Sequence, residues 1–455
     1  MIPTNIATIA RWANGQIASG ALAAAVASVC TDSRALRPGD LFVALRGENF
    51  DGHAFASEAA RLGAAGIVVE DVPADLPAEF PAIKVADTLI ALQQIAARYR
   101  QSLALQVVAI TGSNGKTTTK DLTAAVLGRR FRVTKTDGNF NNHIGLPLTM
   151  LRAGEADQIG VFEIGMNHPG EIAPLAALAV PDVAIITNIG MAHIEYLGSR
   201  EAIAQEKGML AEALSPKGHL ILSAEDEFSR SIAARTLADA VFCGVDTGDV
   251  RATDISQSFT GMKFRLHAEG RSVDAELPVP GVHMVRNALL AVAAGRIFGI
   301  SLEECAEGLR DLRLTKGRLE QKLIRGIQII DDTYNANPDS MSAALLTLSE
   351  MPTTGRRIAV LGRMGELGIE SERGHRRVGQ VAAELKLECV LTVGEEAAWI
   401  SEEAKRHYVA DARNFATIEE AAGALRELSV DGDLVLVKGS RSARMERIVE
   451  ALQSL

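Results

Sequence analysis

The strongest chemical signal in the chain is a loop suited to holding phosphate groups. It reads Thr111-Gly112-Ser113-Asn114-Gly115-Lys116-Thr117-Thr118. Its glycines let backbone amides turn toward phosphate oxygens, and a following helix N-terminus favours negative charge. The Lys116 ammonium suits the β- and γ-phosphates, and the Thr117 hydroxyl suits Mg²⁺. We predict a nucleotide site made by Gly112, Ser113, Asn114, Gly115, Lys116, Thr117 and Thr118.

The predicted nucleotide is ATP rather than GTP. The sequence contains no Asn-Lys-x-Asp guanine signature. The loop is also a shortened form of the usual pattern, because Ile110 stands where another glycine is common.

The elements around this loop predict how it is positioned. An apolar strand over Val107–Ile110 precedes it, and a helix over Lys120–Leu127 follows. Other apolar runs, each followed by a helical pattern, are Ile159–Ile164, Val183–Thr187, Ile327–Asp331, Ile358–Leu361 and Leu434–Val437. Such alternation predicts an α/β fold whose parallel sheets are covered on both faces. In such sheets ligands bind beyond the carboxyl ends of the strands, which is where the phosphate loop lies.

Composition narrows the class of protein. The chain has 455 residues, which at ~150 residues per domain predicts about three domains. A net charge of -10 and only 4% aromatic residues argue against binding nucleic acid. A hydrophobic fraction of 47% excludes long disorder.

Two features predict a cytoplasmic protein. The four cysteines are far apart and form no Cys-x-x-Cys pair, which favours unpaired thiols in a reducing compartment. Residues Trp12–Thr31 carry no charge, but polar residues interrupt them, so we predict an Ala-rich helix of the first domain and no membrane span.

Domain boundaries are predicted from composition shifts. The Pro-rich stretch around Pro73, Pro77 and Pro81 predicts a loop inside the first domain, and a helix over Leu89–Arg100 leads out of it. A second break is expected at Leu312–Gly317, before a new strand-helix series. We predict domains at 1–104, 105–313 and 314–455.

The order of further motifs along nearly the whole chain resembles that of the Mur ligases, the ATP-dependent amino-acid ligases that build the peptide stem of bacterial peptidoglycan. The carriers are Thr31–Arg34, Pro38–Gly47, Phe50–His53, Gly138–Pro147, Thr187–His193, Pro280–Ala288, Gly317–Glu320, Asp331–Ser340, Val360–Gly368 and Lys438–Arg441. The resemblance implies three domains: a smaller α/β N-terminal domain, a central P-loop ATPase domain with a parallel sheet, and a Rossmann-like C-terminal domain.

Within that family the chain is most similar to the type that adds D-Ala-D-Ala to UDP-MurNAc-tripeptide. The resemblance implies that the first domain holds the UDP-sugar end of the substrate, where Ser33, Arg34 and Arg46 suit uracil or diphosphate. It also implies that Asn141 and Asn142 face the peptide, a task for which neutral amides are suited.

The resemblance also implies a metal site with two Mg²⁺ ions. Glu163, at the end of a strand, and His193 would be ligands beside Thr117. Lys207, on a helix over Arg200–Leu210, corresponds to a lysine that CO₂ carbamylates in this family, which turns it into an anionic oxygen ligand. Oxygen ligands suit Mg²⁺ well, whereas histidine is less usual. The catalytic residues predicted on this basis are Lys116, Lys207, His193 and Glu163.

Three residues from later motifs complete the predicted nucleotide site. Asn287 suits the base or ribose, Arg318 suits the phosphates across a domain cleft, and Asp332 suits the ribose hydroxyls. One position departs from the family pattern, because Arg363 stands where the family usually has Asp beside the expected dipeptide site.

The implied reaction passes through an acyl phosphate on the tripeptide carboxylate, which the amine of D-Ala-D-Ala then attacks. No residue is identified as the general base for that amine. The protein is expected to be a monomer.

Two alternative functions stay open. One is a sister ligase that adds a single amino acid, such as a diaminopimelate- or lysine-adding enzyme or a folylpolyglutamate synthase. The other is a regulatory switch that binds ATP without ligation. The Asp-Asn-Pro-Arg motif of the diaminopimelate-adding type is absent from the sequence, and Glu163, His193 and Lys207 would be unnecessary for a switch.

Overall fold

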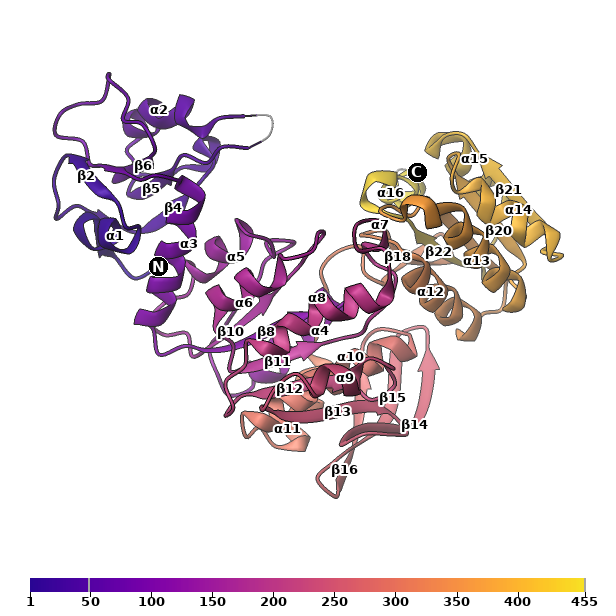
Figure 1. The fold of residues 1–455 in the computed structure, drawn as a ribbon. Coiled ribbons are helices and arrows are strands. Elements are labelled where there is room, and N and C mark those ends of the chain that lie inside the picture. Colours follow the sequence, from indigo (N-terminus) through magenta and orange to yellow (C-terminus); the bar gives the residue numbers. More distant parts are fainter. Residues whose placement is uncertain (48–49, 454–455) are drawn as a thin grey trace. The chain divides into compact units, whose positions relative to one another are not determined.

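The computed structural model describes residues 1–47 and 50–453 (Figure 1). By its internal packing the chain forms two compact units. The first comprises Met1–Ala109, Phe131–Met166 and Glu171–Asp182, and the second comprises Ile110–Arg130, Asn167–Gly170 and Val183–Leu455.

The N-terminal part of the first unit is built on a five-stranded sheet of order β2-β7-β6-β5-β4. The strands are β2 (Gln16–Ser19), β4 (Ser28–Cys30), β5 (Asp40–Val43), β6 (Gly66–Val69) and β7 (Ala82–Lys84), and only β2 runs antiparallel to its neighbour. A small pair, β1 (Thr4–Asn5) and β3 (Ala25–Val26), lies apart from this sheet. The helices are α1 (Ile6–Trp12), α2 (Ala56–Arg61) and α3 (Thr88–Ser102). The structure confirms the predicted helix at Leu89–Arg100 as part of α3, whose N-terminus is capped by the Asp87 side chain.

The predicted helix over Trp12–Thr31 is wrong. Helix α1 ends at Trp12, and β2, β3 and β4 occupy the segment that follows it. Asn14 and Gly20 both have positive φ (54° and 88°), so the chain turns sharply on either side of β2. Gly15 also packs closely against β7, where a Cβ would lie 2.6 Å from the Ile83 side chain. Sheet pairing therefore overrides the helical propensity of the alanines.

The predicted Pro-rich loop is confirmed. Residues 70–81 connect β6 to β7 inside the first unit and contain no helix or strand. The remaining elements of this unit are β9 (Val133–Lys135), β10 (Ile159–Glu163), α5 (Gly145–Met150) and α6 (Ile172–Ala179), with β9 and β10 parallel.

The middle of the chain contributes a nine-stranded sheet of order β16-β15-β14-β13-β12-β11-β8-β10-β9. Its further strands are β8 (Gln106–Thr111), β11 (Val183–Ile186), β12 (His219–Ser223), β13 (Asp239–Val245), β14 (Val250–Ser258), β15 (Gly261–Ala268) and β16 (Arg271–Leu277). The helices are α4 (Lys116–Leu127), α7 (Ile194–Leu197), α8 (Arg200–Glu212), α9 (Ser229–Ala233), α10 (Val282–Ile297) and α11 (Leu302–Arg310).

This sheet is mixed, whereas the sequence predicts a parallel one. Strands β11 to β14 pair in parallel, but β14, β15 and β16 form an antiparallel meander. Buried and exposed residues alternate along β15, which is typical of an antiparallel strand with one solvated face. The turn between β15 and β16 has positive φ at Glu269 and Gly270.

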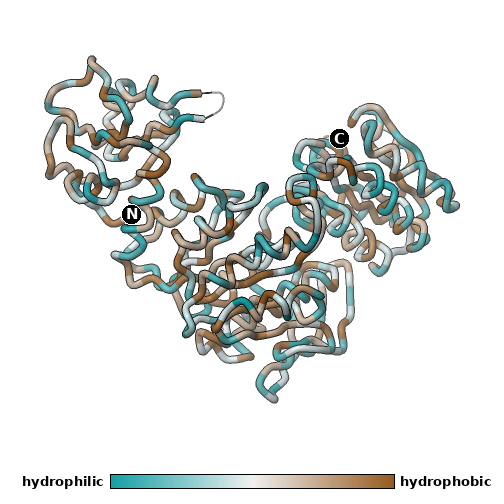
Figure 2. The backbone as a smooth tube through the Cα atoms, viewed as in Figure 1, coloured by the Kyte–Doolittle hydropathy of each residue, from teal (hydrophilic) through white to brown (hydrophobic). Residues whose placement is uncertain are grey.

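The C-terminal part of the second unit is Rossmann-like and is built on a six-stranded sheet of order β17-β18-β22-β19-β20-β21. We call this sheet with its helices the C-terminal layer. The strands are β17 (Glu320–Ile324), β18 (Ile327–Asp332), β19 (Arg357–Gly362), β20 (Cys389–Val393), β21 (Asp411–Phe415) and β22 (Leu434–Lys438), and only β17 is antiparallel. The helices are α12 (Pro338–Glu350), α13 (Ser371–Glu384), α14 (Ala398–Arg406), α15 (Ile418–Leu428) and α16 (Glu446–Gln453). Hydrophilic and hydrophobic stretches alternate along these helices (Figure 2), as expected for helices that cover a buried sheet.

The apolar runs singled out in the sequence are all strands, within one residue at each end. The helix predicted at Lys120–Leu127 begins earlier, at Lys116, because Gly115 adopts the left-handed conformation and starts it. Throughout residues 1–47 and 50–453, no helix has the length and apolar character needed to cross a bilayer.

Candidate nucleotide and metal site

The phosphate loop lies between the end of β8 and the start of α4. Gly112 has φ +146°, and a Cβ there would lie 1.8 Å from the Thr187 hydroxyl oxygen. Gly115 has φ +78° and is the N-cap of α4, to which no side-chain cap hydrogen bond is made. The backbone amides of the first turn of α4 can therefore turn toward an anion.

The segment after β11 holds the loop in this shape. The amides of Ser113 and Asn114 donate to the Asn188 carbonyl and side-chain oxygens (2.9 and 3.0 Å). The Thr187 hydroxyl donates to the Asn114 carbonyl at 2.5 Å, and the Gly190 amide donates to the Ser113 hydroxyl at 2.8 Å. The loop is thus preorganised by hydrogen bonds from one neighbouring segment.

The cation and the hydroxyls predicted for the phosphates lie on this loop. The Lys116 ammonium donates to the Gly112 carbonyl at 2.7 Å, which folds the side chain back over the loop. Thr117 and Thr118, in the first turn of α4, are almost completely buried. This placement suits the roles predicted for all three residues.

Arg318 reaches the same place from the segment before β17. One of its terminal nitrogens donates to the Thr117 hydroxyl at 2.9 Å, and its guanidinium carbon lies 4.2 Å from the centre of the Tyr334 ring. The Arg318 Nε is buried without a hydrogen-bond partner. A partly buried guanidinium with an unused donor at Nε suits an anionic ligand beside Thr117.

The chain leading to Arg318 is anchored on α4. The hydroxyl and amide of Thr315 both donate to one carboxylate oxygen of Asp121, at 3.0 and 3.4 Å. Asp121 lies one turn after Thr117 on α4. Residues 315–318 therefore run along the first turns of the helix.

Asn287, on α10, packs against the loop. A Cβ on Gly115 would lie 2.6 Å from the Asn287 side-chain oxygen, so only glycine leaves room for this amide. His283, one turn earlier on α10, is desolvated, which lowers its pKa to about 4.

Lys207 and His193 lie close enough to Lys116 for their charges to interact. Lys207 is buried on α8, where desolvation first and then the Lys116 charge hold its pKa well below the usual range. Desolvation is also the largest cause that lowers the pKa of His193, and the charges of Lys116 and Lys207 lower it further. The structure thus brings together three predicted catalytic groups in the second unit.

Side chains from the C-terminal layer contact this cluster. The Asn337 amide donates to the Asn114 side-chain oxygen at 2.8 Å. The Met191 amide donates to Asp339 at 2.8 Å, and a carboxylate oxygen of Glu366 lies 2.5 Å from His193 Nδ1. The close contact with His193 lowers the pKa of Glu366.

Glu163 and Asn141 meet in the first unit. Glu163 is buried at the end of β10, where its carboxylate accepts from the Asn141 side-chain amide at 2.8 Å. Asn142 instead accepts from the amides of Ile144 and Gly145 (3.2 and 2.9 Å), so its side-chain oxygen shapes the start of α5.

The other predicted substrate residues lie in N-terminal turns. Ser33 and Arg34 belong to a short 3₁₀ turn that Asp32 caps, and Arg34 is exposed and paired with Asp32 at 2.7 Å. Arg46 pairs with Asp51 and Glu70, at 3.1 and 2.9 Å. Both arginines are held by carboxylates of their own neighbourhood.

Asp332 and Arg363 lie at the carboxyl edge of the C-terminal sheet. The two carboxylate oxygens of Asp332 accept from the Leu319 amide and the Lys438 ammonium, at 3.2 and 2.6 Å. Asp332 therefore has a clear structural role beside the predicted one. Arg363 pairs with Glu396 at 3.1 Å, so its positive charge is balanced locally.

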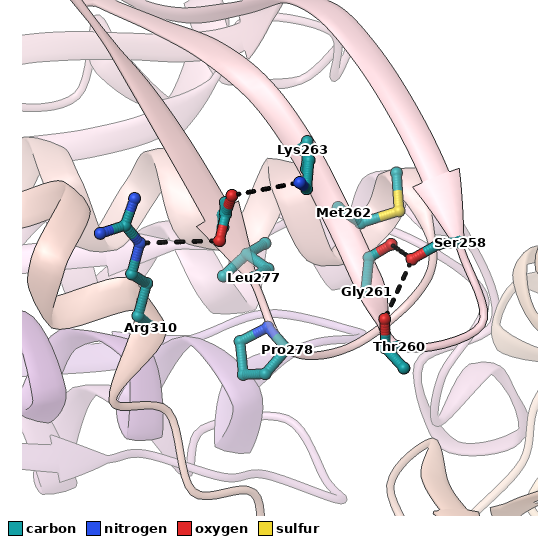
Figure 3. A pocket seen from close by; sticks show the side chains of 9 residues that line it. Ser258, Thr260, Gly261, Met262, Lys263, Leu277, Pro278 and Arg310 are labelled. Carbon is teal, nitrogen blue, oxygen red and sulfur yellow. Dashed lines mark hydrogen bonds and ion pairs between the residues drawn. The ribbon is translucent and has the colours of Figure 1, made fainter.

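A cavity of about 310 Å³ lies elsewhere in the second unit, at the antiparallel meander (Figure 3). Its lining residues are Ser258, Thr260, Gly261, Met262, Lys263, Glu276, Leu277, Pro278 and Arg310. Glu276 pairs with both Lys263 and Arg310, at 3.4 and 3.8 Å. None of these residues is predicted for the site, and both cations that line the cavity are already paired with one carboxylate.

No group of three or more His, Cys, Asp or Glu side chains is arranged to hold a metal in the part of the chain that the structure describes. The predicted ligand set is of a different kind, because it includes a threonine hydroxyl and a modified lysine. The buried, desolvated Lys207 amine fits that modification, since a neutral amine is the form that reacts with CO₂.

Comparison with protein families accounts for this arrangement. Three family models match successive segments: the Mur ligase family, catalytic domain, at residues 25–100; the Mur ligase middle domain at 110–295; and the Mur ligase, glutamate ligase domain, at 317–441. The chain belongs to the Mur ligase family. The matches confirm the resemblance and the three-domain α/β fold expected from the motifs.

Individual Mur ligases are similar over the full length. UDP-N-acetylmuramoyl-tripeptide--D-alanyl-D-alanine ligase of Bacillus subtilis is 41% identical over 461 residues, which cover 99% of each chain. The Escherichia coli ligase of the same name is 37% identical over 459 residues, covering 100% of this chain and 99% of that one.

Solved structures agree with this. MurF from Acinetobacter baumannii superimposes with a TM-score of 0.92 at 34% identity, covering 100% of this chain and 99% of that one. The MurF ligase from Thermotoga maritima, solved in complex with ADP, has a TM-score of 0.84 at 30% identity and covers 94% and 97%.

Sequence reasoning missed several residues that shape this Mur ligase site. Tyr334 and Asp339 lie in the motif Asp331–Ser340, and Glu366 lies in the motif Val360–Gly368, but the sequence alone predicts no role for any of the three. Asp121 and Thr315 gave no signal, because they lie 194 positions apart in the chain.

Proposed function

We propose that this chain uses ATP to join D-Ala-D-Ala to UDP-MurNAc-tripeptide, forming a C–N bond in peptidoglycan precursor synthesis. The observation that carries the proposal is the convergence of Lys116, Thr117 and Arg318 on one phosphate loop. The full-length likeness to D-alanyl-D-alanine ligases of this family supports the choice of substrates. The ADP complex of a relative supports the use of ATP.

The reaction needs activation, because a carboxylate is a poor electrophile. ATP supplies a phosphoryl group that turns the terminal carboxylate of the tripeptide into an acyl phosphate, and the amine of D-Ala-D-Ala then displaces phosphate to leave an amide. Lys116 neutralises charge on the β- and γ-phosphates, and Arg318 stabilises the charge that develops during transfer. We expect the contacts of Asn337 with Asn114, of Asp339 with Met191 and of Glu366 with His193 to help exclude water from the reacting groups.

Magnesium is the metal that this site suits. We assign Thr117, Glu163, His193 and Lys207 as the residues that hold two Mg²⁺ ions, with Lys207 in its carbamylated form. Bound Mg²⁺ would supply positive charge at the transferring phosphoryl group. The carbamate forms when the neutral Lys207 nitrogen attacks the carbon of CO₂ and releases a proton, and the burial of Lys207 favours the neutral amine.

The three segments divide the substrates among them. We assign residues 1–104 to the UDP-sugar, with Ser33, Arg34 and Arg46 as contacts. Residues 105–313 hold ATP and the peptide, with Asn141, Asn142 and Asn287 as contacts. Residues 314–455 close over the nucleotide through Asp332 and take the dipeptide.

We further propose that the protein acts as a monomer in the bacterial cytoplasm. The free thiols of Cys30, Cys243, Cys305 and Cys389 support a reducing compartment.

The decisive assay measures phosphate release and product mass with ATP, UDP-MurNAc-tripeptide and either D-Ala-D-Ala or single amino acids. We expect phosphate release only with D-Ala-D-Ala. The product mass should exceed that of UDP-MurNAc-tripeptide by the mass of D-Ala-D-Ala less one water. Release only with a single amino acid would assign the chain to a sister ligase. ATP turnover at the same rate with every acceptor would identify a regulatory ATP-binding switch instead.

A further inference from the structure

A short turn after β11 carries the predicted metal ligand His193. The turn comprises residues Gly190–His193, and we call it the histidine turn. Its first amide donates to the Ser113 hydroxyl of the phosphate loop at 2.8 Å, and His193 itself has φ +64°. An L residue adopts this left-handed conformation at a cost in free energy, so other contacts must hold the turn.

One such contact comes from the start of α12. The Asp339 carboxylate accepts from the Met191 amide at 2.8 Å. Gly190 makes this approach feasible, because a Cβ there would lie 2.2 Å from an Asp339 oxygen. The backbone of the histidine turn is therefore fixed by a carboxylate from the C-terminal layer.

A second contact comes from the loop after β19. A carboxylate oxygen of Glu366 lies 2.5 Å from His193 Nδ1. The Glu366 backbone is itself tied to α7, because the Glu195 amide donates to its carbonyl at 3.4 Å. Gly368 also packs closely there, where a Cβ would lie 2.9 Å from the Glu195 side chain.

The charge of Glu366 favours one tautomer of the His193 imidazole. A carboxylate at Nδ1 favours the tautomer that carries its proton on Nδ1, which leaves the Nε2 lone pair as the available ligand. Carboxylates in this position commonly raise the affinity of a histidine site for its metal.

We infer that Glu366 and Asp339 are positioning residues that present His193 Nε2 to a divalent cation, so that full cation affinity requires the C-terminal layer to be docked on the histidine turn. The inference rests on the proposed function, which assigns His193 as a metal ligand. It adds that the ligand set is completed by carboxylates that do not touch the metal.

The test measures cation binding directly. Mn²⁺ is titrated into the full-length protein with a non-hydrolysable ATP analogue, and free Mn²⁺ is followed by electron paramagnetic resonance. We expect Glu366→Gln to weaken Mn²⁺ binding by about tenfold or more. Asp339→Ala should weaken it as well. Glu370→Gln is the matched control, since Glu370 lies on the same loop but pairs with the exposed Arg373, and it should bind Mn²⁺ like the wild type.

A double-mutant cycle shows whether Glu366 acts through His193. In the His193→Ala background, Glu366→Gln should have no further effect on Mn²⁺ binding. Unchanged or tighter Mn²⁺ binding by Glu366→Gln would overturn the inference, and tighter binding would show that Glu366 blocks the ligand. If His193→Ala weakens Mn²⁺ binding but Glu366→Gln does not, this inference fails while the metal assignment survives. If His193→Ala itself leaves Mn²⁺ binding unchanged, the metal assignment of the proposed function fails too.

Discussion

Replacing Arg318 with lysine tests whether its guanidinium, rather than its charge alone, serves the phosphate site. Lysine keeps one positive charge but loses the planar fork that reaches Thr117 and stacks on Tyr334. We therefore expect Arg318→Lys to lower kcat/KM for ATP while the protein stays folded.

The magnitude follows from the two contacts. A hydrogen bond from a charged group contributes about 1.5–3 kcal/mol, and a cation–π contact about 0.5–2 kcal/mol. Lysine retains part of each, so the expected loss is about 2–3 kcal/mol. That corresponds to a fall in kcat/KM of roughly 30- to 150-fold.

The assay is steady-state phosphate release at varied ATP with both other substrates saturating. Arg313→Lys is the matched control, because Arg313 is an exposed arginine on the same linker. Tyr334→Leu separates the stacking contribution and should cost roughly three- to tenfold. A fall of less than threefold for Arg318→Lys, or an equal fall for Arg313→Lys, would refute the reasoning.

Three further predictions concern the loop, the buried lysine and pH. Gly112→Ala should abolish nucleotide binding in calorimetry, because the new Cβ would collide with the Thr187 hydroxyl, whereas Gly423→Ala, which meets open space, should bind normally. Lys207→Ala should lose ligase activity in the phosphate-release assay, and wild-type activity should fall in CO₂-depleted buffer and return with bicarbonate; equal activity of variant and wild type in both buffers would exclude the carbamate. Because the folded pKa of His283 is depressed to about 4, its contribution to stability is present above pH 6.5 and is lost as pH falls toward 4. We expect urea unfolding at pH 7 and pH 5 to show that the free energy of unfolding falls by about 2 kcal/mol less in His283→Asn than in the wild type. An equal fall in both proteins would contradict this.

The sequence predicted the parts of the fold that depend on local pattern. The phosphate loop, the buried strands and α3 were all found, because an apolar run or a glycine spacing is visible within a few residues. The helix predicted over Trp12–Thr31 was wrong because an Ala-rich stretch does not show which segment it will pair with. The pairing of β2 with β7 determined the structure there. The antiparallel meander was missed, although the alternation along β15 was visible in the sequence.

The site could be predicted only as a set of residues with roles, not as an arrangement. Lys116 and Thr117 follow from their motif. The partner of His193 does not, because Glu366 lies 173 positions later, and only the fold brings its carboxylate to the imidazole. The structural duty of Asp332, which accepts from Leu319 and Lys438, was hidden for the same reason.

The anchoring of Thr315 and Arg318 along α4 limits how this protein can change in length. Asp121 and Thr117 are four residues apart on the helix, which is about 6 Å along its axis. Residues 315–318 must span that separation while both ends stay bonded. One inserted residue would add up to about 3.5 Å, more than the length of either bond, and would move the guanidinium off its hydroxyl. The length of residues 315–318 is therefore fixed by α4. Insertions and deletions are tolerated in surface loops, but between 315 and 318 they would separate Arg318 and the C-terminal layer from the nucleotide site.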